Sequence, residues 1–566
     1  MKTFSGRRTR RNFIGEVGAM VGGVLLPAGH ICAAKDDRMP IEAAFGDATG
    51  EAEESFPPED VRHYGIVPNV AAAASKNTSA LKTLVNPAGT FTGKLIFPNT
   101  TGSDTYFFDD LIAFHEGVHL DLLNSTLSFA RTGSARDSAS GFIHAIRDFT
   151  IENGRIITNY VFKGGYNTGN ALAFGGRGAD TALFPNLYDR QLAVPMGNIS
   201  VRNLRITGGA SGGNARGIFM LGGIDGIVID NVAIDGQKQF TEGIYYEFGW
   251  ATGEARELER QSSHAVNFRV TNLAVKNVVN AAFGASGAYD IVIDGLQVND
   301  VGHGCLIGTG EALYFRPWLP PGARGRRPSF VLRNFIGEAI RNVGVAVTGA
   351  SKISGSYLDN PPAHNNPLNI GPDQQHDLID FVIENFSMSG PSKNYGIVTS
   401  AAEAQIRKGT IAQFERGIVT TQECTSFAID SVKILDSGSF GIQIGQSVTL
   451  HTPARLATGS VGNCFIAGSG TEGKCAGVFV ATTRRCVIEA NRFGFVMDTD
   501  GKAETTQTQA VSVAADASGV VCRNNDVAAT ADGAVAYVLA GAGLRDCRIE
   551  NPGGIHTASG AWLARR

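Results

Sequence analysis

The sequence predicts an all-β protein: a right-handed parallel β-helix, or solenoid, with a short N-terminal capping helix. Eight segments share one pattern, in which two inward-facing apolar residues alternate with polar ones, an Asn, Gly or Ser interrupts the run, and a second short strand follows. Glycine supplies 71 of the 566 residues, which indicates many turns. The eight segments are FTIENGRI from Phe149, ISVRNLRI from Ile199, IVIDNVAI from Ile227, FRVTNLAV from Phe268, IVIDGLQV from Ile291, FVLRNFIG from Phe330, FVIENFSM from Phe381 and FAIDSVKI from Phe427.

The interrupting residues mark the bends of the coil. Asn and Gly tolerate the left-handed backbone that a sharp bend between two strands needs. Successive marks, such as Asn203, Asn231, Asn272 and Gly295, lie about 23 to 50 residues apart. Single coils take the lower end of that range, and wider gaps hold either two coils or one coil with a long loop. A doubly wound α/β fold is the competing interpretation, but amphipathic helices of ten or more residues are missing between the strands. Each coil buries its inner face only against its neighbours, so one long solenoid is expected.

The first residues have the features of a targeting signal. A cationic segment, RRTRRNFIG, precedes the apolar run VGAMVGGVLLPAG, which is too short to span a bilayer, and small residues suit cleavage after Ala34. The stretch from Thr9 to Ile14 resembles the twin-arginine export signal. We therefore expect a signal peptide over residues 1–34, a flexible linker over 35–58 and a single β-helix domain over 59–566, in a periplasmic or secreted protein.

The charge and cysteine content of the chain limit the kinds of partner that it can bind. With 18% charged residues and a formal net charge of −4, the chain shows neither a basic face nor a long cationic run in its body, so we expect no nucleic-acid or membrane-surface partner. Seven cysteines follow Cys32 at irregular spacing, which argues against a full disulfide framework, and no C-x-x-C pair suggests zinc. We expect no metal and leave the oligomeric state open.

Three segments near the start resemble a known family. DVRHYGIVPN (60–69), NTSALKTLV (77–85) and GKLIFPNTTG (93–102) are similar to the opening of the pectate-lyase superfamily. In that superfamily a D-V-x-x-Y-G strand, a short helix and a G-x-x-x-F-P strand plug the N-terminal end of a β-helix. Its members include lyases, hydrolases, epimerases and phage tailspikes, so the resemblance implies a polysaccharide or oligosaccharide substrate and does not fix the reaction.

Insertions on a solenoid emerge on one face and form its cleft, so the widest gaps between bends point to the site. TEGIYYEFGWATGE (241–254) and GTGEALYFRPWLPPGARGRRP (308–328) lie in two such gaps and are rich in aromatic and acidic residues. Sugar rings present apolar faces rimmed by hydroxyls, which suit aromatic platforms with carboxylates and amides. The expected substrate-binding residues are Tyr245, Tyr246, Trp250, His264, Tyr314, Arg316, Trp318, Asp373 and His376.

Hydrolysis of a glycosidic bond needs two carboxyl groups, one as acid and one as base or nucleophile. We expect Glu247 and Glu311 to form this catalytic pair, with Glu242 and Asp373 in reserve. VGHGCLIGTG (301–310) resembles the Gly-His-Gly element of polygalacturonase-type hydrolases, which implies that His303 assists the acids. The Asn-Thr-Asp, Asp-Asp and Arg-Ile-Lys elements of those hydrolases are absent.

Two alternatives stay open. A β-eliminating lyase acting on a uronic-acid glycan needs a base and a cation that neutralises the substrate carboxylate. Its candidates are Tyr246, His264, His303, Arg316, Arg324, Arg326 and Arg327. Calcium is the cofactor expected in that case only; Asp225, Asp230 and Asp235 line consecutive bends, although alternation explains them without metal. A non-catalytic glycan-binding solenoid should have short, uniform loops, whereas this chain concentrates its irregularity in the middle third, which favours an enzyme.

Overall fold

The computed structural model describes most of the chain from residue 56 onward. The described ranges are 56–85, 91–133, 141–162, 169–175, 196–211, 215–222, 224–247, 249–250, 261–263, 265–286, 289–308, 316–318, 329–348, 379–421, 424–446, 457–470, 476–494, 496–497, 503–504, 507–514, 516–527, 535–539, 546–550 and 564–565. The predicted signal peptide lies outside them.

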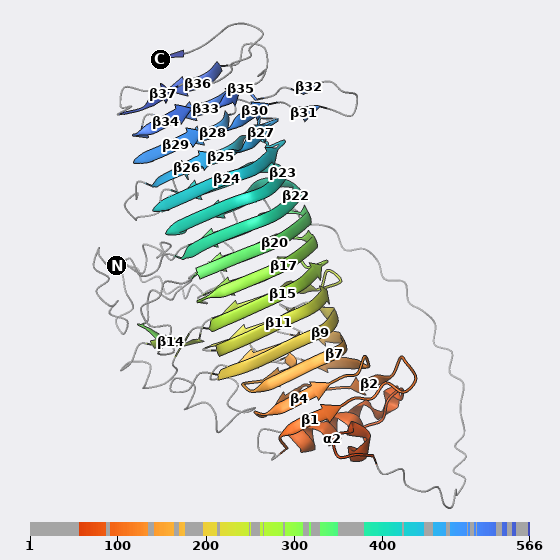
Figure 1. The fold of residues 1–566 in the computed structure, drawn as a ribbon. Helices are drawn as coiled ribbons and strands as arrows, with labels where there is room; N and C mark the ends of the chain where they lie inside the picture. Colours follow the sequence, from red (N-terminus) through yellow and green to blue (C-terminus); the bar gives the residue numbers. More distant parts are fainter. Residues whose placement is uncertain are drawn as a thin grey trace, which may run out of the picture. The chain divides into compact units, whose positions relative to one another are not determined.

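Thirty-three strands are joined in one ladder, and their pairings divide it into three faces. Each coil of chain crosses the first, second and third face in turn and pairs in parallel with the coils before and after it. Figure 1 shows the coils stacked one upon another, with helix α2 (Ala74–Val85) at the end where the stack begins and β36 and β37 at the other end. The predicted parallel β-helix is confirmed.

The strands are grouped here by face. The first face contains β1 (Gly93–Ile96), β4 (Val118–Asp121), β7 (Phe149–Phe162), β9 (Met196–Ser211), β11 (Ile224–Asp235), β15 (Val266–Lys276), β17 (Ile291–Val301), β20 (Ser329–Ile340), β22 (Asp380–Thr399), β23 (Glu403–Thr421), β24 (Ser426–Leu435), β26 (Thr458–Gly462), β29 (Arg485–Glu489), β34 (Val520–Arg523) and β37 (Arg548–Glu550). The second face contains the later parts of β7, β9, β11, β15, β17, β20, β22, β23 and β24, with β2 (Thr105–Phe108), β5 (Thr126–Gly133), β27 (Phe465–Ala467), β30 (Arg492–Gly494) and β35 (Asp526–Val527). The third face contains β3 (Ile112–Phe114), β6 (Gly141–Ala145), β8 (Asn170–Gly175), β10 (Ala215–Leu221), β12 (Phe240–Glu247), β16 (Ala281–Ser286), β18 (His303–Gly308), β21 (Val345–Thr348), the ends of β22 and β23, β25 (Phe440–Gln446), β28 (Ala476–Val480), β33 (Gln509–Val513), β36 (Val535–Leu539) and β38 (Ala564–Arg565). A hairpin of β31 (Val496–Met497) and β32 (Ala503–Glu504) stands apart.

The bend between the first and second faces is built as predicted. Asn203, Asn231 and Asn272 have φ angles of 49°, 51° and 50°, and Gly295 has 79°. The Asn side chains also link the coils, since Asn231 Nδ2 donates to Asn203 Oδ1 at 2.8 Å. Later coils keep the same left-handed backbone with other residues, such as Lys408 at 55°. The bend is therefore imposed by the coil, and Asn is the residue that adopts it at least cost.

The wide gaps between bends hold one coil each. Strands β7 and β9 pair directly, although Asn153 and Asn203 are 50 residues apart, and β20 and β22 also pair directly. A second coil in either gap would separate these strands. The wide gaps therefore contain insertions.

A column of glycines marks the corner between the second and third faces. A Cβ atom at any of these positions would lie between 2.4 and 2.7 Å from a carbonyl oxygen of the next coil. The column comprises Gly217, Gly243, Gly304, Gly344, Gly396, Gly417 and Gly441. Neighbouring coils approach too closely here for a side chain, which accounts for part of the high glycine content.

The N-terminal end of the stack is closed by the predicted capping helix. Helix α2 packs against β2 and β3, and two 3₁₀ turns, η1 (Val61–Tyr64) and η2 (Ala71–Ala73), precede it. The resemblance implied a strand over DVRHYG, and this prediction is wrong because the 3₁₀ turn η1 occupies that segment. The Asp60 side chain accepts a hydrogen bond from the Arg62 amide at the start of the turn, and Gly65 ends it with φ of 76°.

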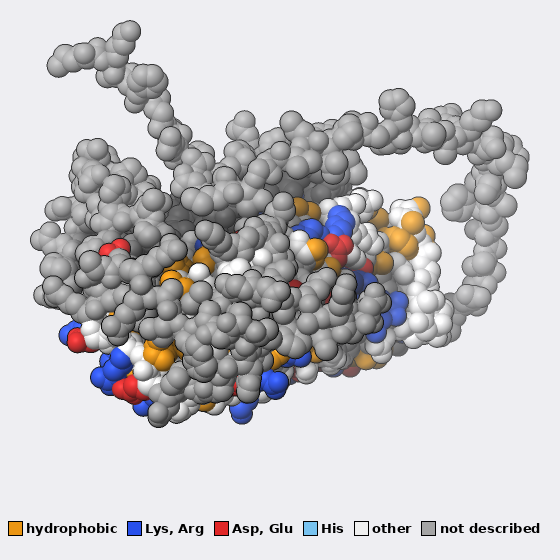
Figure 2. All heavy atoms as spheres, turned by 90° about the horizontal axis from the view of Figure 1, so that it is seen from above, with side chains coloured by type: hydrophobic (Ala, Val, Ile, Leu, Met, Phe, Trp, Pro, Cys, Tyr) orange, Lys and Arg blue, Asp and Glu red, His pale blue; other side chains and the backbone are white. Residues whose placement is uncertain are grey.

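The interior is apolar and the described surface carries charges of both signs. Rings such as Phe149, Phe174 and Phe268 are completely buried between the faces. Figure 2 shows, in its one view, basic and acidic side chains next to each other on the described surface. No helix within the described ranges has the length and apolar character needed to cross a membrane.

Candidate functional site

Two long insertions leave the coil where strands of the third face end. Residues 248–265 separate β12 from β15, and residues 309–328 separate β18 from β20. In the coil between them only residues 287–290 separate β16 from β17. Two long insertions therefore emerge on either side of a short connection, at one corner of the stack.

The two insertions join in a small sheet of their own. Strands β13 (Gly249–Trp250) and β14 (Gln261–Ser263) come from the first insertion, and β19 (Arg316–Trp318) comes from the second. Strand β14 pairs antiparallel with β13 and parallel with β19. The two aromatic segments singled out by sequence thus meet, with the backbones at Trp250 and Trp318 two strand spacings, or about 10 Å, apart.

Glu247 lies directly before this small sheet. It is the last residue of β12, is half-buried, and pairs with Ser286 at the end of β16, which in turn pairs with Gly308 at the end of β18. Two strand spacings place the backbones of Glu247 and Gly308 about 10 Å apart. Glu311 follows Gly308 by three residues in the sequence. The end of β12 at Glu247 and the end of β18 at Gly308 are therefore neighbours on the same face, and Glu311 itself lies outside the described residues.

Alternation along β12 turns its two tyrosines in opposite directions. Tyr246 belongs to the interior cluster and is completely buried, and its hydroxyl lies 2.9 Å from the Gly222 carbonyl oxygen and 2.6 Å from the Ala265 amide. Burial raises the pKa of Tyr246 far above its usual range. This side chain presents no face to a sugar and no ionisable hydroxyl to a substrate, so it is not available as the predicted platform or lyase base.

Tyr245 points to the outer side of the third face, where it forms a stack with Phe219 of β10. The ring centroids are 6.1 Å apart and the planes differ by 4°. The Arg216 guanidinium lies 4.8 Å from both centroids. Tyr245 is only 9% exposed and Phe219 only 3%. The stack therefore fixes β12 against β10 and holds Glu247, two residues beyond Tyr245, in a defined position.

A buried ion pair also holds β12 against β10. Arg216 Nε lies 2.9 Å from Glu242 Oε2, and Asn280 Nδ2 donates to Glu242 Oε1 at 3.0 Å. Their relative side-chain exposures are 13% for Arg216 and 5% for Glu242. Glu242 is five residues before Glu247 on one strand, which corresponds to roughly 15 Å of extended chain. That distance exceeds the carboxyl spacing of a glycosidase pair, so these two glutamates do not form one.

His303 begins β18, at the far end of the strand from Gly308. It pairs with Ala281, and its ring nitrogens lie 3.4 Å from the Val343 amide and from Asn342 Nδ2. Burial, assisted by the Arg341 charge, lowers the pKa of His303 to about 4, so the imidazole is neutral at physiological pH. Glu247 is level with Gly308, which is five residues further along the strand than His303. His303 therefore lies roughly 15 Å from Glu247, too far to assist it by proton transfer as predicted.

The Gly-His-Gly stretch has a structural explanation. Gly304 belongs to the glycine column. In other coils too, an outward-facing residue comes directly before the column glycine, as in Arg216–Gly217 and Glu242–Gly243. His303 occupies the outward position of its coil. The likeness to the polygalacturonase element thus follows from the repeat of this solenoid. The same repeat, visible as ARGIFML and TEGIYYE, was the signal that could have identified Arg216 and Phe219, which the sequence analysis missed.

Several predicted residues cannot be placed. Those that lie outside the described residues are Glu311, His264, Tyr314, Asp373, His376, Arg324, Arg326 and Arg327. For Trp250, Arg316 and Trp318 the structure describes the backbone alone. The pairing of Glu247 with Glu311 consequently stays a prediction.

The aspartates considered for calcium do not converge. Asp225, Asp230 and Asp235 are spaced five residues apart along β11, and each is bonded to a different neighbour. Asn277 Nδ2, for example, donates to Asp235 Oδ1 at 2.9 Å. Within the described ranges no three His, Cys, Asp or Glu side chains gather to hold a metal ion. These three residues do not fit a calcium site.

Comparison with known proteins gives distant structural likeness alone. No family model matches the sequence, and a search of curated protein sequences finds no match. The A-module of mannuronan C-5 epimerase AlgE4 from Azotobacter vinelandii is 10% identical with a TM-score of 0.38, over 88% of this chain and 99% of that one. A tailspike protein mutant of Escherichia coli bacteriophage HK620 in complex with a pentasaccharide is 10% identical with a TM-score of 0.39, over 81% and 74%.

A third structure is the catalytic unit of the GH87 α-1,3-glucanase of Streptomyces thermodiastaticus, at 11% identity and a TM-score of 0.33, over 90% of this chain and 71% of that one. All three TM-scores are below 0.5. The classification of this chain as a parallel β-helix protein therefore rests on its own strand pairings, and the activities of these proteins are not transferred to it.

Proposed function

We propose that the chain is an exported polysaccharide-cleaving enzyme that hydrolyses glycosidic bonds at the corner where β12 and β18 end. The observation that carries the proposal is the small sheet of β13, β14 and β19, which joins insertions from two coils directly beyond Glu247. A solenoid that needs only its coils for stability has no need to connect its insertions in this way. Joined insertions fit the walls of a substrate groove.

Glu247 is the central residue of the proposed mechanism, with Glu311 as its partner. One carboxyl donates a proton to the glycosidic oxygen as the bond to the anomeric carbon breaks, and the other either activates a water molecule or attacks that carbon. A carboxyl separation of about 5 Å would give retention and one of about 6.5 to 9.5 Å would give inversion. The stack of Tyr245, Phe219 and Arg216 would keep the Glu247 backbone fixed during both steps.

The exchange of Glu247 for Gln tests the proposal. Glu247→Gln keeps the size of the side chain and removes its charge, so activity on a cleaved polysaccharide should fall by at least about a hundredfold. Thermal stability should hardly change, because Glu247 is half-buried at a strand end. Cleavage is measured as new reducing ends over a panel of neutral and uronic polysaccharides. Glu403→Gln, at an exposed carboxyl on the first face, is the control and should retain full activity.

The products distinguish hydrolysis from β-elimination. Reducing ends without ultraviolet-absorbing unsaturated sugars identify a hydrolase, whereas unsaturated products from uronic polysaccharides identify a lyase and contradict the mechanism above. A Glu247→Gln protein that is less stable but fully active per folded molecule would assign Glu247 to structure. Binding without cleavage of any polysaccharide in the panel would favour a glycan-binding solenoid.

Export by the twin-arginine route is part of the proposal. Replacing Arg10 and Arg11 together by Lys should leave folded, uncleaved protein in the cytoplasm, because a receptor reads the arginine pair and charge alone does not replace it. Cell fractionation with immunoblotting measures the outcome. Unchanged export of the double variant would indicate the general secretory route.

A further inference from the structure

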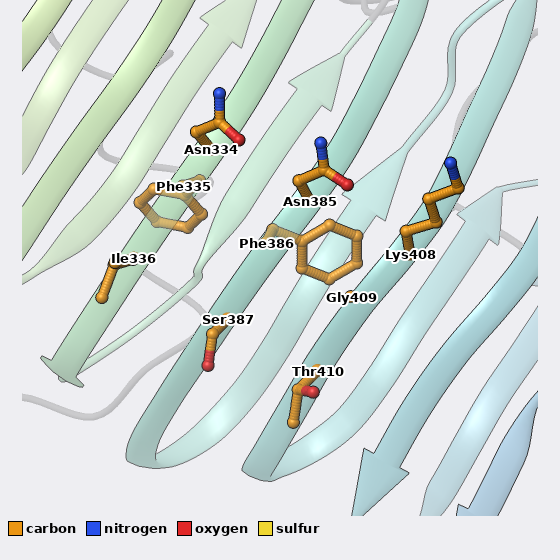
Figure 3. A pocket seen from close by; sticks show the side chains of 9 residues that line it. All are labelled: Asn334, Phe335, Ile336, Asn385, Phe386, Ser387, Lys408, Gly409 and Thr410. Carbon is orange, nitrogen blue, oxygen red and sulfur yellow. The ribbon is translucent and has the colours of Figure 1, made fainter.

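The outer side of the second face carries a trough that the proposed cleavage site does not use. Two hollows lie on this face, of about 550 Å³ and about 380 Å³, and both are lined by Ile336. Figure 3 shows the smaller hollow, where Ile336, Ser387 and Thr410 lie in one row on neighbouring strands and Asn334, Asn385 and Lys408 lie in a second row at the bend. The shared residue makes the two hollows one continuous feature.

The trough runs along the axis of the stack. Its lining residues come from seven successive second-face strands: β9, β11, β15, β17, β20, β22 and β23. Six strand spacings correspond to about 29 Å. A small molecule binds in a concave site that buries most of its surface, which this shallow, open trough does not provide. The trough therefore suits a long chain that gains weak contacts from many coils.

The side chains of the trough combine an aliphatic floor with polar neighbours. Ala233 and Ala274 form a low part of the floor, and Ile336 is 49% exposed, unusually high for a large apolar side chain. Gln297 and Asn299 stand beside them and are exposed. Apolar patches next to amides match a sugar chain, whose rings have apolar faces and hydroxyl rims.

The charges of the larger hollow balance. Asp235 lies 3.2 Å from Lys276 Nζ, so this pair is internally neutralised. The remaining charges are Arg205 and Glu338, on strands at opposite ends of the hollow. Nucleic acids bind along grooves lined by cations, and anionic polymers would meet Asp235 and Glu338 here. The smaller hollow adds one cation, Lys408, so the whole trough has an excess of one positive charge and no row of cations, which favours a neutral ligand.

Polypeptide ligands fit the trough poorly. The backbone groups of the strands are already bonded to the coils on both sides, so an added peptide strand would find no free sheet edge. Proline-rich peptides dock on aromatic grooves, but Phe335 and Phe386 of this region are buried at 0% and 4% exposure. A helix needs a row of apolar pockets, and Ile336 is the one large apolar side chain exposed in the described trough.

We propose that this trough binds a neutral polysaccharide chain lying along the stack, at a site separate from the cleavage site. Successive coils place one outward row each, about 4.8 Å apart, so a polymer of similar repeat can make one contact at each coil. Each contact is weak, and their sum holds the polymer near the enzyme.

Electrophoresis through gels containing a dissolved polysaccharide tests the proposal. The probes are a neutral glucan, a neutral galactomannan and, for comparison, a polyuronate. The full-length protein should be retarded by at least one neutral polymer, and added salt should change the retardation little. Ile336→Glu places a charge at the point shared by both hollows and should weaken binding at least tenfold. Val70→Glu changes a side chain that is 47% exposed on the N-terminal cap and should have no effect.

The outcomes separate this site from the cleavage site. Glu247→Gln should be retarded as strongly as the unchanged protein, and Ile336→Glu should cleave short oligosaccharides at the normal rate. Retardation that persists in Ile336→Glu, that occurs with the polyuronate alone, or that is absent with both neutral polymers overturns the proposal. Retardation without any cleavage would leave the trough in place and contradict the proposed enzyme.

Discussion

The second and third faces of the solenoid have the same backbone and opposite surfaces. On the second face, outward side chains such as Ile336 are open to solvent, with 49% exposure. On the third face, outward side chains such as Phe219 and Tyr245 are 3% and 9% exposed. The strand pattern is the same in both cases, but on the third face Phe219 and Tyr245 stack on each other and on the Arg216 guanidinium. An outward position on the described faces is therefore buried where large side chains of neighbouring coils stack together.

The ion pairs on the two faces differ in exposure in the same way. Arg216 and Glu242 on the third face have side-chain exposures of 13% and 5%, whereas Lys276 and Asp235 on the second face have 58% and 27%. Hydration is largely lost in the first pair and largely kept in the second. The two pairs should therefore respond very differently to the loss of one partner.

The largest effect is expected from Arg216→Met. This change leaves the Glu242 carboxylate buried without its cation, which should cost about 3–5 kcal/mol in the free energy of local opening. Hydrogen exchange of the β10 and β12 amides measures that free energy in a solenoid whose coils need not open together. Lys276→Met on the second face is the matched control and should cost less than about 1 kcal/mol.

A double variant tests whether the loss of stability comes from the unpaired charge. Arg216→Met combined with Glu242→Leu removes both charges, and it should recover much of the stability lost by the single change. Equal losses in Arg216→Met and Lys276→Met would show that the third-face pair is hydrated like the second-face pair. The contrast between the two faces would then not extend to their energetics.

The pH dependence of stability provides a smaller effect on the same covered face. The pKa of His303 is about 4 in the folded chain and near 6.5 when unfolded, so acid favours the unfolded state between these values. Lowering the pH from 7 to 5 should reduce the free energy of unfolding by about 2 kcal/mol through this residue. Equilibrium urea unfolding of the native protein and of His303→Gln measures the difference.

Between pH 7 and 5 the native protein should lose about 2 kcal/mol in free energy of unfolding relative to His303→Gln. Carboxyls with lowered pKa, such as Asp300, titrate below this window and contribute equally to both proteins. A pH dependence that is identical in His303→Gln would mean that His303 is solvated and lies on an open surface.

The corner between the two faces should show an effect of about the same size as the pH effect. In Gly304→Ala the new Cβ would lie 2.4 Å from the Gly344 carbonyl oxygen, which forces neighbouring coils apart and should cost about 1–3 kcal/mol. Gly462→Ala is the control, because its Cβ would meet no atom closer than 3.6 Å. The thermal unfolding of both variants measures the contrast. Equal melting temperatures would show that the coils separate at this corner without strain.

The bends and the insertions were predictable from sequence for separate reasons. A left-handed bend needs a residue that tolerates positive φ, so Asn231 and Asn272 reveal the bend locally. An insertion lengthens the interval between bends, so residues 248–265 and 309–328 were visible as gaps. Where Lys408 occupies the bend, sequence preference gives no sign, because the coils on either side impose the conformation.

The strand end at Glu247 stands out in the sequence, whereas the surroundings of its neighbouring side chains do not. Clustering of aromatic and acidic residues located the strand end at Glu247, since composition is a local property. The separate fates of Tyr245 and Tyr246 depend on which of two adjacent residues faces the interior, and the register of β12 decides that. Arg216 escaped notice because its partner Glu242 is 26 residues away in the sequence and adjacent only after the coils stack.

The sequence by itself therefore determined the solenoid, its capping helix, its bends and the coils that carry insertions, because each depends on short-range preferences repeated many times. The tertiary structure decided which outward side chains are covered, which charges pair, and that two insertions meet in one small sheet. These properties depend on coil-to-coil register and on packing between distant segments. Free energies of burial and pairing act on that arrangement, and no local pattern encodes it.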